Sequence, residues 1–163
     1  MNTSEARETF TGRSDWIWIR TPADENTYAE FRSRFAAEGG EATLRISAEG
    51  AYEAFLNGKW LPSSQCADLP MMKAVSCVPL ATRTGENELL VRVWYQGEDT
   101  SVSRREPAGL RFEVCAKTGK MLAFSCADTQ ARIDARYHNG PIEPFTPQMG
   151  ASFRYVDAPP HPW

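Results

Sequence analysis

The sequence predicts an all-β protein, an antiparallel β-sandwich, and three observations support that prediction. The dipeptide Asn57-Gly58 separates two apolar stretches. A type I′ hairpin turn favours this pair because both of its central residues need a positive φ. Apolar and polar residues alternate with period two in several segments, as they do along half-buried strands. These segments recur at intervals of roughly 8 to 12 residues with turn signals between them, which is typical of a sandwich or barrel.

The chain begins with a polar stretch, residues 1–14, that has no periodicity and is expected to be a frayed lead-in. Order is expected from Asp15, where Trp16 and Trp18 share one face of an extended segment. A single β-sandwich domain is predicted over residues 15–157.

Residues 28–35 fit either a helix or a strand. A strand is favoured because charged residues alternate strictly with others, and Gly39-Gly40 is expected to end it. A second strand over 42–48 turns at Glu49-Gly50 into the Asn57-Gly58 hairpin. Two long strands are therefore expected to lie side by side here.

Further strand patterns follow in the second half of the chain. Residues 62–79 predict a long crossover with a short strand near 74–78, and 89–95 is the best candidate for a central strand. Residues 96–108 are polar and are expected to form a loop at one end of the sheet. A second hairpin is predicted over 110–125, with its turn at Lys117–Lys120.

The last part of the chain is rich in proline. One strand is predicted over 152–156, and residues 158–163 are interpreted as the start of a linker to an absent downstream domain.

Composition narrows the class of protein. The chain has 163 residues, 24% of them charged, and a net charge of −3, which suits one globular domain and does not favour nucleic-acid binding. No run of about 18 apolar residues predicts a membrane span, and the polar N-terminus does not resemble a signal peptide. A cytoplasmic protein is expected. In that compartment Cys66, Cys77, Cys115 and Cys126 are predicted to be buried free thiols, since their spacing fits no zinc motif.

A set of residues resembles one family in its order and spacing. The set comprises residues 16–18, 26–28, 31–32, Phe35, residues 42–44, 46–48, Tyr52, residues 56–59, Leu80, residues 85–87, Gly97, Gly109, Leu110 and the later segment 150–158. It is similar to the N-terminal, non-catalytic domain of bacterial α-L-rhamnosidases, glycoside hydrolase family 78. The resemblance implies a jelly roll like that of galactose-binding domains, followed in the family by a catalytic (α/α) barrel.

Two departures limit what the resemblance implies. The family usually continues after the hairpin with Gly-Pro and an aromatic, acidic stretch, whereas this chain has Leu61–Gln65, so its crossover has diverged. The family's catalytic carboxylates lie in the barrel, and no residue of this chain matches them. No catalytic residue is therefore assigned.

Carbohydrate binding is the chemistry that the residues favour. Pyranose rings stack on Trp and Tyr while polar side chains bond their hydroxyls. The candidate residues are Trp94, Tyr95, Gln96, Arg104, Arg105, Glu106 and, after the hairpin, Trp60.

Other site types have weaker patterns. Glu98, Asp99 and Glu106 share one loop but are expected to be solvated, and His138 and His161 lack the neighbours of a metal site or triad. No metal and no cofactor is predicted.

Three hypotheses follow. The leading one is an accessory module of a rhamnosidase-like hydrolase, with the downstream catalytic domain and a rhamnose- or galactose-containing glycan as partners. An autonomous carbohydrate-binding protein and a small self-standing enzyme are the alternatives.

Overall fold

The computed structural model describes residues 9–20, 23–62, 73–100, 104–146, 150–159 and 162–163. This part of the chain forms strands and loops, without a helix. The strands are β1 (Thr27–Ala48), β2 (Ala51–Leu56), β3 (Lys59–Leu61), β4 (Ser76–Tyr95), β5 (Leu110–Ala116), β6 (Met121–Phe124), β7 (Gln130–Ile133), β8 (Pro144–Thr146) and β9 (Gly150–Ala151). The predicted all-β class is confirmed.

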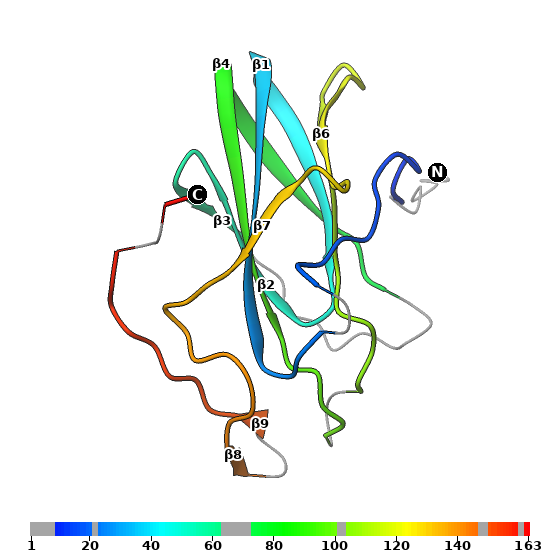
Figure 1. The fold of residues 1–163 in the computed structure, drawn as a ribbon. Helices are drawn as coiled ribbons and strands as arrows, with labels where there is room; N and C mark the ends of the chain where they lie inside the picture. The colour runs from blue at the N-terminus through cyan, green and yellow to red at the C-terminus, as the bar shows by residue number, and fades with distance from the viewer. Residues whose placement is uncertain (1–8, 21–22, 63–72, 101–103, 147–149, 160–161) are drawn as a thin grey trace.

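One antiparallel sheet makes up most of the molecule. Its strand order is β3-β2-β4-β1-β5-β6. The edge of β1 away from β4 pairs with β7 in its first part and with β5 in its last part. The two longest strands, β1 and β4, keep one register from Thr27 opposite Tyr95 to Ile46 opposite Ser76. Figure 1 shows them rising together to the top of the view and turning over, so that their other halves descend beside β5 and β6. The sheet thus covers itself as a sandwich.

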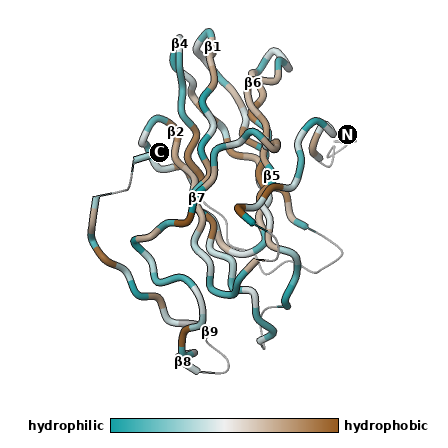
Figure 2. The backbone as a smooth tube through the Cα atoms, in the orientation of Figure 1, coloured by the Kyte–Doolittle hydropathy of each residue, from teal (hydrophilic) through white to brown (hydrophobic). Residues whose placement is uncertain are grey.

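Glycines lie at the point where the two long strands turn over. Gly39, Gly40 and Gly85 have φ values of 85°, 110° and 90°, which glycine adopts without steric cost. Their neighbours are exposed, and Figure 2 shows the tips of β1 and β4 as mostly hydrophilic. The prediction that Gly39-Gly40 ends a strand is wrong, because here the glycines bend one continuous strand.

The core lies between the two halves of the folded sheet. Its largest fully buried apolar side chains come from both halves, and they are Phe31, Leu44, Ile46, Leu89, Val91, Val93, Leu110, Phe112 and Val114. Burying one side chain of this size contributes about 1.5–3 kcal/mol, so this cluster is the main source of stability.

Several predicted elements are confirmed. The segment 28–35 is a strand, residues 89–95 lie in the centre of the sheet, and the second hairpin is formed by β5 and β6. Asn57 and Gly58 have φ values of 52° and 76°, as the type I′ turn requires.

Other predictions are wrong. Residues 42–48 and β2 do not pair, because β4 lies between the two strands in the sheet order. The chain crosses between the layers at Gly50, whose φ is 104°. The short strand expected near 74–78 is the beginning of the long β4. The strand predicted over 152–156 is reduced to one bridge between Tyr137 and Tyr155, with no continuous partner strand among the described residues.

The thiols only partly follow the prediction. Cys115 is buried, Cys126 is half-buried, and both are free thiols. Cys77 is exposed, because it points outward from β4, and Cys66 lies outside the described residues. Of the expected lead-in, residues 1–8 are likewise outside them, whereas Thr11 and Ser14 are hydrogen-bonded to Glu113 of β5.

Candidate functional site

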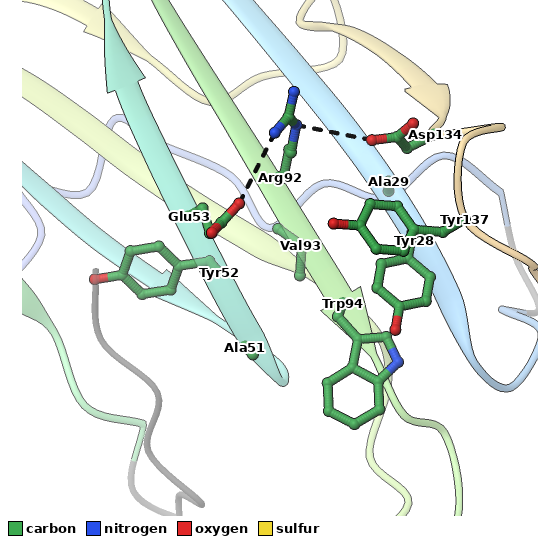
Figure 3. A pocket seen from close by; sticks show the side chains of 10 residues that line it. All are labelled: Tyr28, Ala29, Ala51, Tyr52, Glu53, Arg92, Val93, Trp94, Asp134 and Tyr137. Carbon is green, nitrogen blue, oxygen red and sulfur yellow. Dashed lines mark ion pairs between the residues drawn. The ribbon is translucent and has the colours of Figure 1, made fainter. Parts of the chain in front are cut away.

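The outer face of the layer formed by β2, β4, β1 and β7 carries a cleft of about 360 Å³. Figure 3 shows charged groups at its upper end, three aromatic rings (Trp94, Tyr28 and Tyr137) along one side and Tyr52 on the other. The cleft is lined by Tyr28, Ala29, Ala51, Tyr52, Glu53, Arg92, Val93, Trp94, Asp134 and Tyr137.

Strand register places the charged groups next to the aromatic rings. Ala51, Trp94 and Tyr28 are cross-strand neighbours on β2, β4 and β1. Two residues along each strand, Glu53, Arg92 and Glu30 form the next row, which continues to Arg132 on β7. Because side chains alternate between faces with period two, both rows project from the same face.

The aromatic side is held in place by stacking and hydrogen bonds. Tyr28 and Tyr137 stack with ring centroids 4.1 Å apart, and Tyr28 lies 6.1 Å from Trp94 with rings inclined by 21°. The Trp94 indole donates a hydrogen bond from Nε1 to Asn26 Oδ1 at 3.0 Å. The pKa of Tyr28 is raised to about 12, chiefly by burial and to a smaller extent by the neighbouring Tyr137. The phenol therefore remains neutral at physiological pH.

The charged end rests on Glu30, which is only 1% exposed. Its Oε1 accepts hydrogen bonds from Arg92 Nε at 2.9 Å and Arg136 Nη2 at 2.8 Å. Its Oε2 accepts from Arg132 Nε and Nη2 at 2.8 and 2.6 Å. Three guanidinium groups therefore surround one buried carboxylate.

Asp134 is the second anchor of this end. Burial alone would raise its pKa, but hydrogen bonds from Arg136 and the charges of Arg136 and Arg92 outweigh burial and lower it. The bonds from Arg136 Nε and Nη2 measure 2.8 and 2.5 Å. Asp134 is thus an ionised hydrogen-bond acceptor.

Arg92 connects the buried charges to the cleft. Its Nε bonds Glu30 and lies 3.7 Å from Asp134 Oδ2, while its Nη1 is 3.9 Å from the half-exposed Glu53. Figure 3 shows Arg92 between Glu53 and Asp134. A cation and two carboxylates consequently stand beside an aromatic wall.

The residues predicted from the sequence are divided between two places. Trp94 lies in the outer cleft, but Tyr95 points to the opposite face, where it is buried against Trp18 at 5.7 Å. Its hydroxyl donates to the backbone oxygen of Glu106 at 2.7 Å. Tyr95, Arg105 and Glu106 line a second cleft of about 400 Å³ at the end of the sandwich.

The other predicted residues lie outside both clefts. Among the described residues, the buried Nε2 of Gln96 has no hydrogen-bond partner. Arg104 is exposed and donates to the backbone oxygen of Thr100 at 3.1 Å. Trp60 is 56% exposed on the edge strand β3.

Sequence reasoning missed Tyr28, Glu53, Arg92, Asp134 and Tyr137. The opposite charges of Glu30, Arg92 and Glu53 on three predicted strands are a usable signal once the strand order is known. Asp134 and Tyr137 have no comparable signal, because their place depends on the pairing of β7 with β1.

Other kinds of site find little support. Within the described ranges no three His, Cys, Asp or Glu side chains gather as metal ligands, and no helix is long and apolar enough to cross a membrane. Nε2 of His138 is 3.2 Å from the backbone oxygen of Pro141. Burial and the neighbouring Glu25 raise the pKa of Glu98 in the 96–108 loop.

Comparison with known proteins bears on the fold. No protein-family model and no curated protein matches the sequence. Among solved structures, the family 78 rhamnosidase of Bacillus sp. GL1 matches 88% of this chain with a TM-score of 0.77 and 24% identity. The fold is one that α-L-rhamnosidases contain.

Two further α-L-rhamnosidases share the fold. The enzyme of Streptomyces avermitilis, solved with L-rhamnose, matches 73% of this chain with a TM-score of 0.54 and 22% identity. That of Aspergillus terreus matches 77% with a TM-score of 0.55 and 17% identity. The chain spans 16% of the Bacillus enzyme, 12% of the Streptomyces enzyme and 16% of the Aspergillus enzyme. The resemblance indicated by residue order is thereby confirmed at the level of the fold.

Proposed function

We propose that the chain is an N-terminal accessory module of an α-L-rhamnosidase-like glycoside hydrolase, which binds carbohydrate or orients the catalytic domain and has no catalytic residues of its own. The observation that supports this most is the match of 88% of the chain to only 16% of the Bacillus rhamnosidase. The proposed module comprises residues 15–157. The module's partner is then the catalytic domain of the same protein.

The outer cleft supports a carbohydrate-binding role. Its aromatic wall offers rings on which the C–H face of a pyranose packs, and its charged end offers donors and acceptors for hydroxyl groups. A mostly apolar pocket with a few fixed polar groups is the usual form of a small-molecule site.

The surface after β9 supports a role in contacting a neighbouring domain. Phe153 and Val156 are 72% and 60% exposed, and Tyr155 between them is also exposed. Exposed large apolar side chains that are neighbours in the sequence suit contact with another domain, since contiguous exposed apolar surface marks interaction sites.

Asp134 of the outer cleft does not suit the role of proton donor in glycoside hydrolysis. That reaction needs one carboxylic acid that holds a proton, which requires a raised pKa. Asp134 has a lowered pKa because Arg136 and Arg92 stabilise its charge. Asp134 is therefore ionised at neutral pH and does not serve as that proton donor.

Hydrolysis of 4-nitrophenyl α-L-rhamnoside by the purified chain tests the proposal. We expect no release of 4-nitrophenol above the buffer blank. Release that follows the chain through purification and disappears on heat denaturation would show a self-standing enzyme and contradict the accessory role.

A further inference from the structure

We infer that the outer cleft binds a neutral pyranose, with the ring against Trp94 and its hydroxyls bonded by Arg92 and Glu53. This inference rests on the proposed function and specifies the class of ligand and the place where it binds.

The room for a sugar ring comes from the small residue opposite Trp94. Ala51 is the cross-strand partner of Trp94 on β2, whereas Tyr28 stands on the β1 side of the indole. Alanine is too small to cover the β2 side of the indole, and Trp94 and Ala51 both line the cleft and are both only partly buried. An apolar ring face packs on such a surface.

The orientation of the indole is fixed before any ligand arrives. Its Nε1 is bonded to Asn26 Oδ1, and Asn26 is itself held by its Nδ2, which donates to the backbone oxygen of Gly140 at 2.9 Å. The aromatic platform therefore loses little conformational entropy on binding.

The polar groups at the other end suit a pair of adjacent hydroxyls. Arg92 presents N–H donors, and Glu53 presents acceptors 3.9 Å from them. Glu30 holds Arg92 through its Nε, and Nη1 of the same guanidinium is directed toward Glu53, as Figure 3 shows. A guanidinium can donate to one hydroxyl while a neighbouring carboxylate accepts from another, and both hydrogen bonds are charge-assisted.

The charges favour a neutral ligand over an anionic one. Arg92 is the cation that lines the cleft, and it already faces Glu30, Asp134 and Glu53. A ligand carboxylate placed there meets two cleft carboxylates, Glu53 and Asp134, and like charges at such distances repel. A uronic acid should therefore bind less well than its neutral counterpart.

Titration of the purified chain tests the inference, with intrinsic tryptophan fluorescence and calorimetry as readouts. The probes are L-rhamnose, D-galactose and D-galacturonate, the last two differing only at C6. We expect millimolar binding of at least one neutral sugar, and galacturonate at least about tenfold weaker than galactose.

Four variants locate the site. Trp94→Ala removes the platform, and Ala51→Leu fills the space above it without removing a contact. Each is expected to weaken binding about tenfold, the loss of roughly one aromatic contact. Trp60→Ala removes the exposed tryptophan of β3 and should leave binding unchanged. Glu53→Gln keeps an acceptor without its charge and should narrow the difference between galactose and galacturonate. Circular dichroism melts establish that each variant is folded.

Every other outcome overturns the inference. Unchanged affinity in folded Ala51→Leu places the ligand elsewhere, as does loss of binding in Trp60→Ala alone. If the affinity for galacturonate equals or exceeds the affinity for galactose, the cleft carboxylates do not repel an anionic ligand. No binding of either neutral sugar at about 100 mM excludes a neutral-pyranose site. None of these results affects the accessory role, which the rhamnoside assay tests separately.

Discussion

The buried carboxylate of Glu30 gives a prediction whose size follows from its contacts. In Glu30→Gln the side chain keeps its shape and loses its charge. Arg92, Arg132 and Arg136 then lose the carboxylate that accepts four hydrogen bonds of 2.6 to 2.9 Å from them. The new amide places an N–H group against guanidinium donors.

Removing one partner of a buried ion pair costs about 3–5 kcal/mol, because it leaves a desolvated charge unpaired. Asp134 remains beside Arg92 and Arg136, which places the expected loss at the lower end, about 3 kcal/mol. In a protein of this length each kcal/mol lowers the thermal midpoint by about 2–4 °C, so a decrease of about 6–12 °C is expected.

Urea denaturation and thermal melts of Glu30→Gln measure this loss. The control is Glu38→Gln, which removes an exposed carboxylate 3.5 Å from Lys120 and should leave both midpoints unchanged. If the free energy of unfolding of Glu30→Gln is within about 1 kcal/mol of the wild-type value, the three arginines do not need this counter-charge.

Two further predictions concern the pH dependence of stability and the glycines of the turns. Burial would raise the pKa of Glu113, but hydrogen bonds from the Thr11 backbone and from the Ser14 and Thr11 hydroxyls outweigh it and lower that pKa below 4.5. A lowered pKa means that this stabilisation is complete above about pH 4.5 and is lost as the pH falls through the folded-state pKa. Glu113→Gln should therefore reduce the slope of the free energy of unfolding against pH in this range, as measured by urea denaturation at several pH values. The same slope in the variant and the wild type would contradict this expectation. Gly50→Ala places a Cβ against the backbone oxygen of Trp94 at a φ of 104°, whereas Gly58→Ala meets nothing within 4 Å at a φ of 76°. We expect Gly50→Ala to unfold or severely destabilise the protein and Gly58→Ala to lower the free energy of unfolding by about 1 kcal/mol, both measured by equilibrium denaturation. Equal losses in the two variants would contradict the steric role of Gly50.

Period-two alternation and turn residues predict most of the strands. Alternating charge in 28–35 is enough to distinguish a strand from a helix, and Asn57-Gly58 predicts both positive φ values. Which strands pair is harder to predict from the sequence. Two glycine-containing stretches that resemble turns instead bend β1 and β4. Whether such a glycine ends or bends a strand depends on the partner strand, which local sequence does not specify.

The candidate site shows the same limit. Trp94 and Tyr95 are adjacent in the sequence and are both candidate carbohydrate-binding residues, yet adjacent residues of a strand point to opposite faces of the sheet. The two side chains therefore cannot line the same cleft. Asp134 and Tyr137 reach the cleft only because Asp134 N bonds the backbone oxygen of Tyr28 at 2.8 Å, a contact across more than 100 residues. No local sequence pattern predicts this contact.

Carbohydrate is proposed to bind on the outer face beside Trp94. The most direct test of this binding is the response of the indole N–H resonances of the five tryptophans to titration with L-rhamnose and D-galactose by NMR. We expect the Trp94 resonance, assigned from its absence in Trp94→Ala, to shift most, while that of Trp60 does not move. Shifts confined to Trp18 beside Tyr95, or to Trp60, would contradict binding beside Trp94.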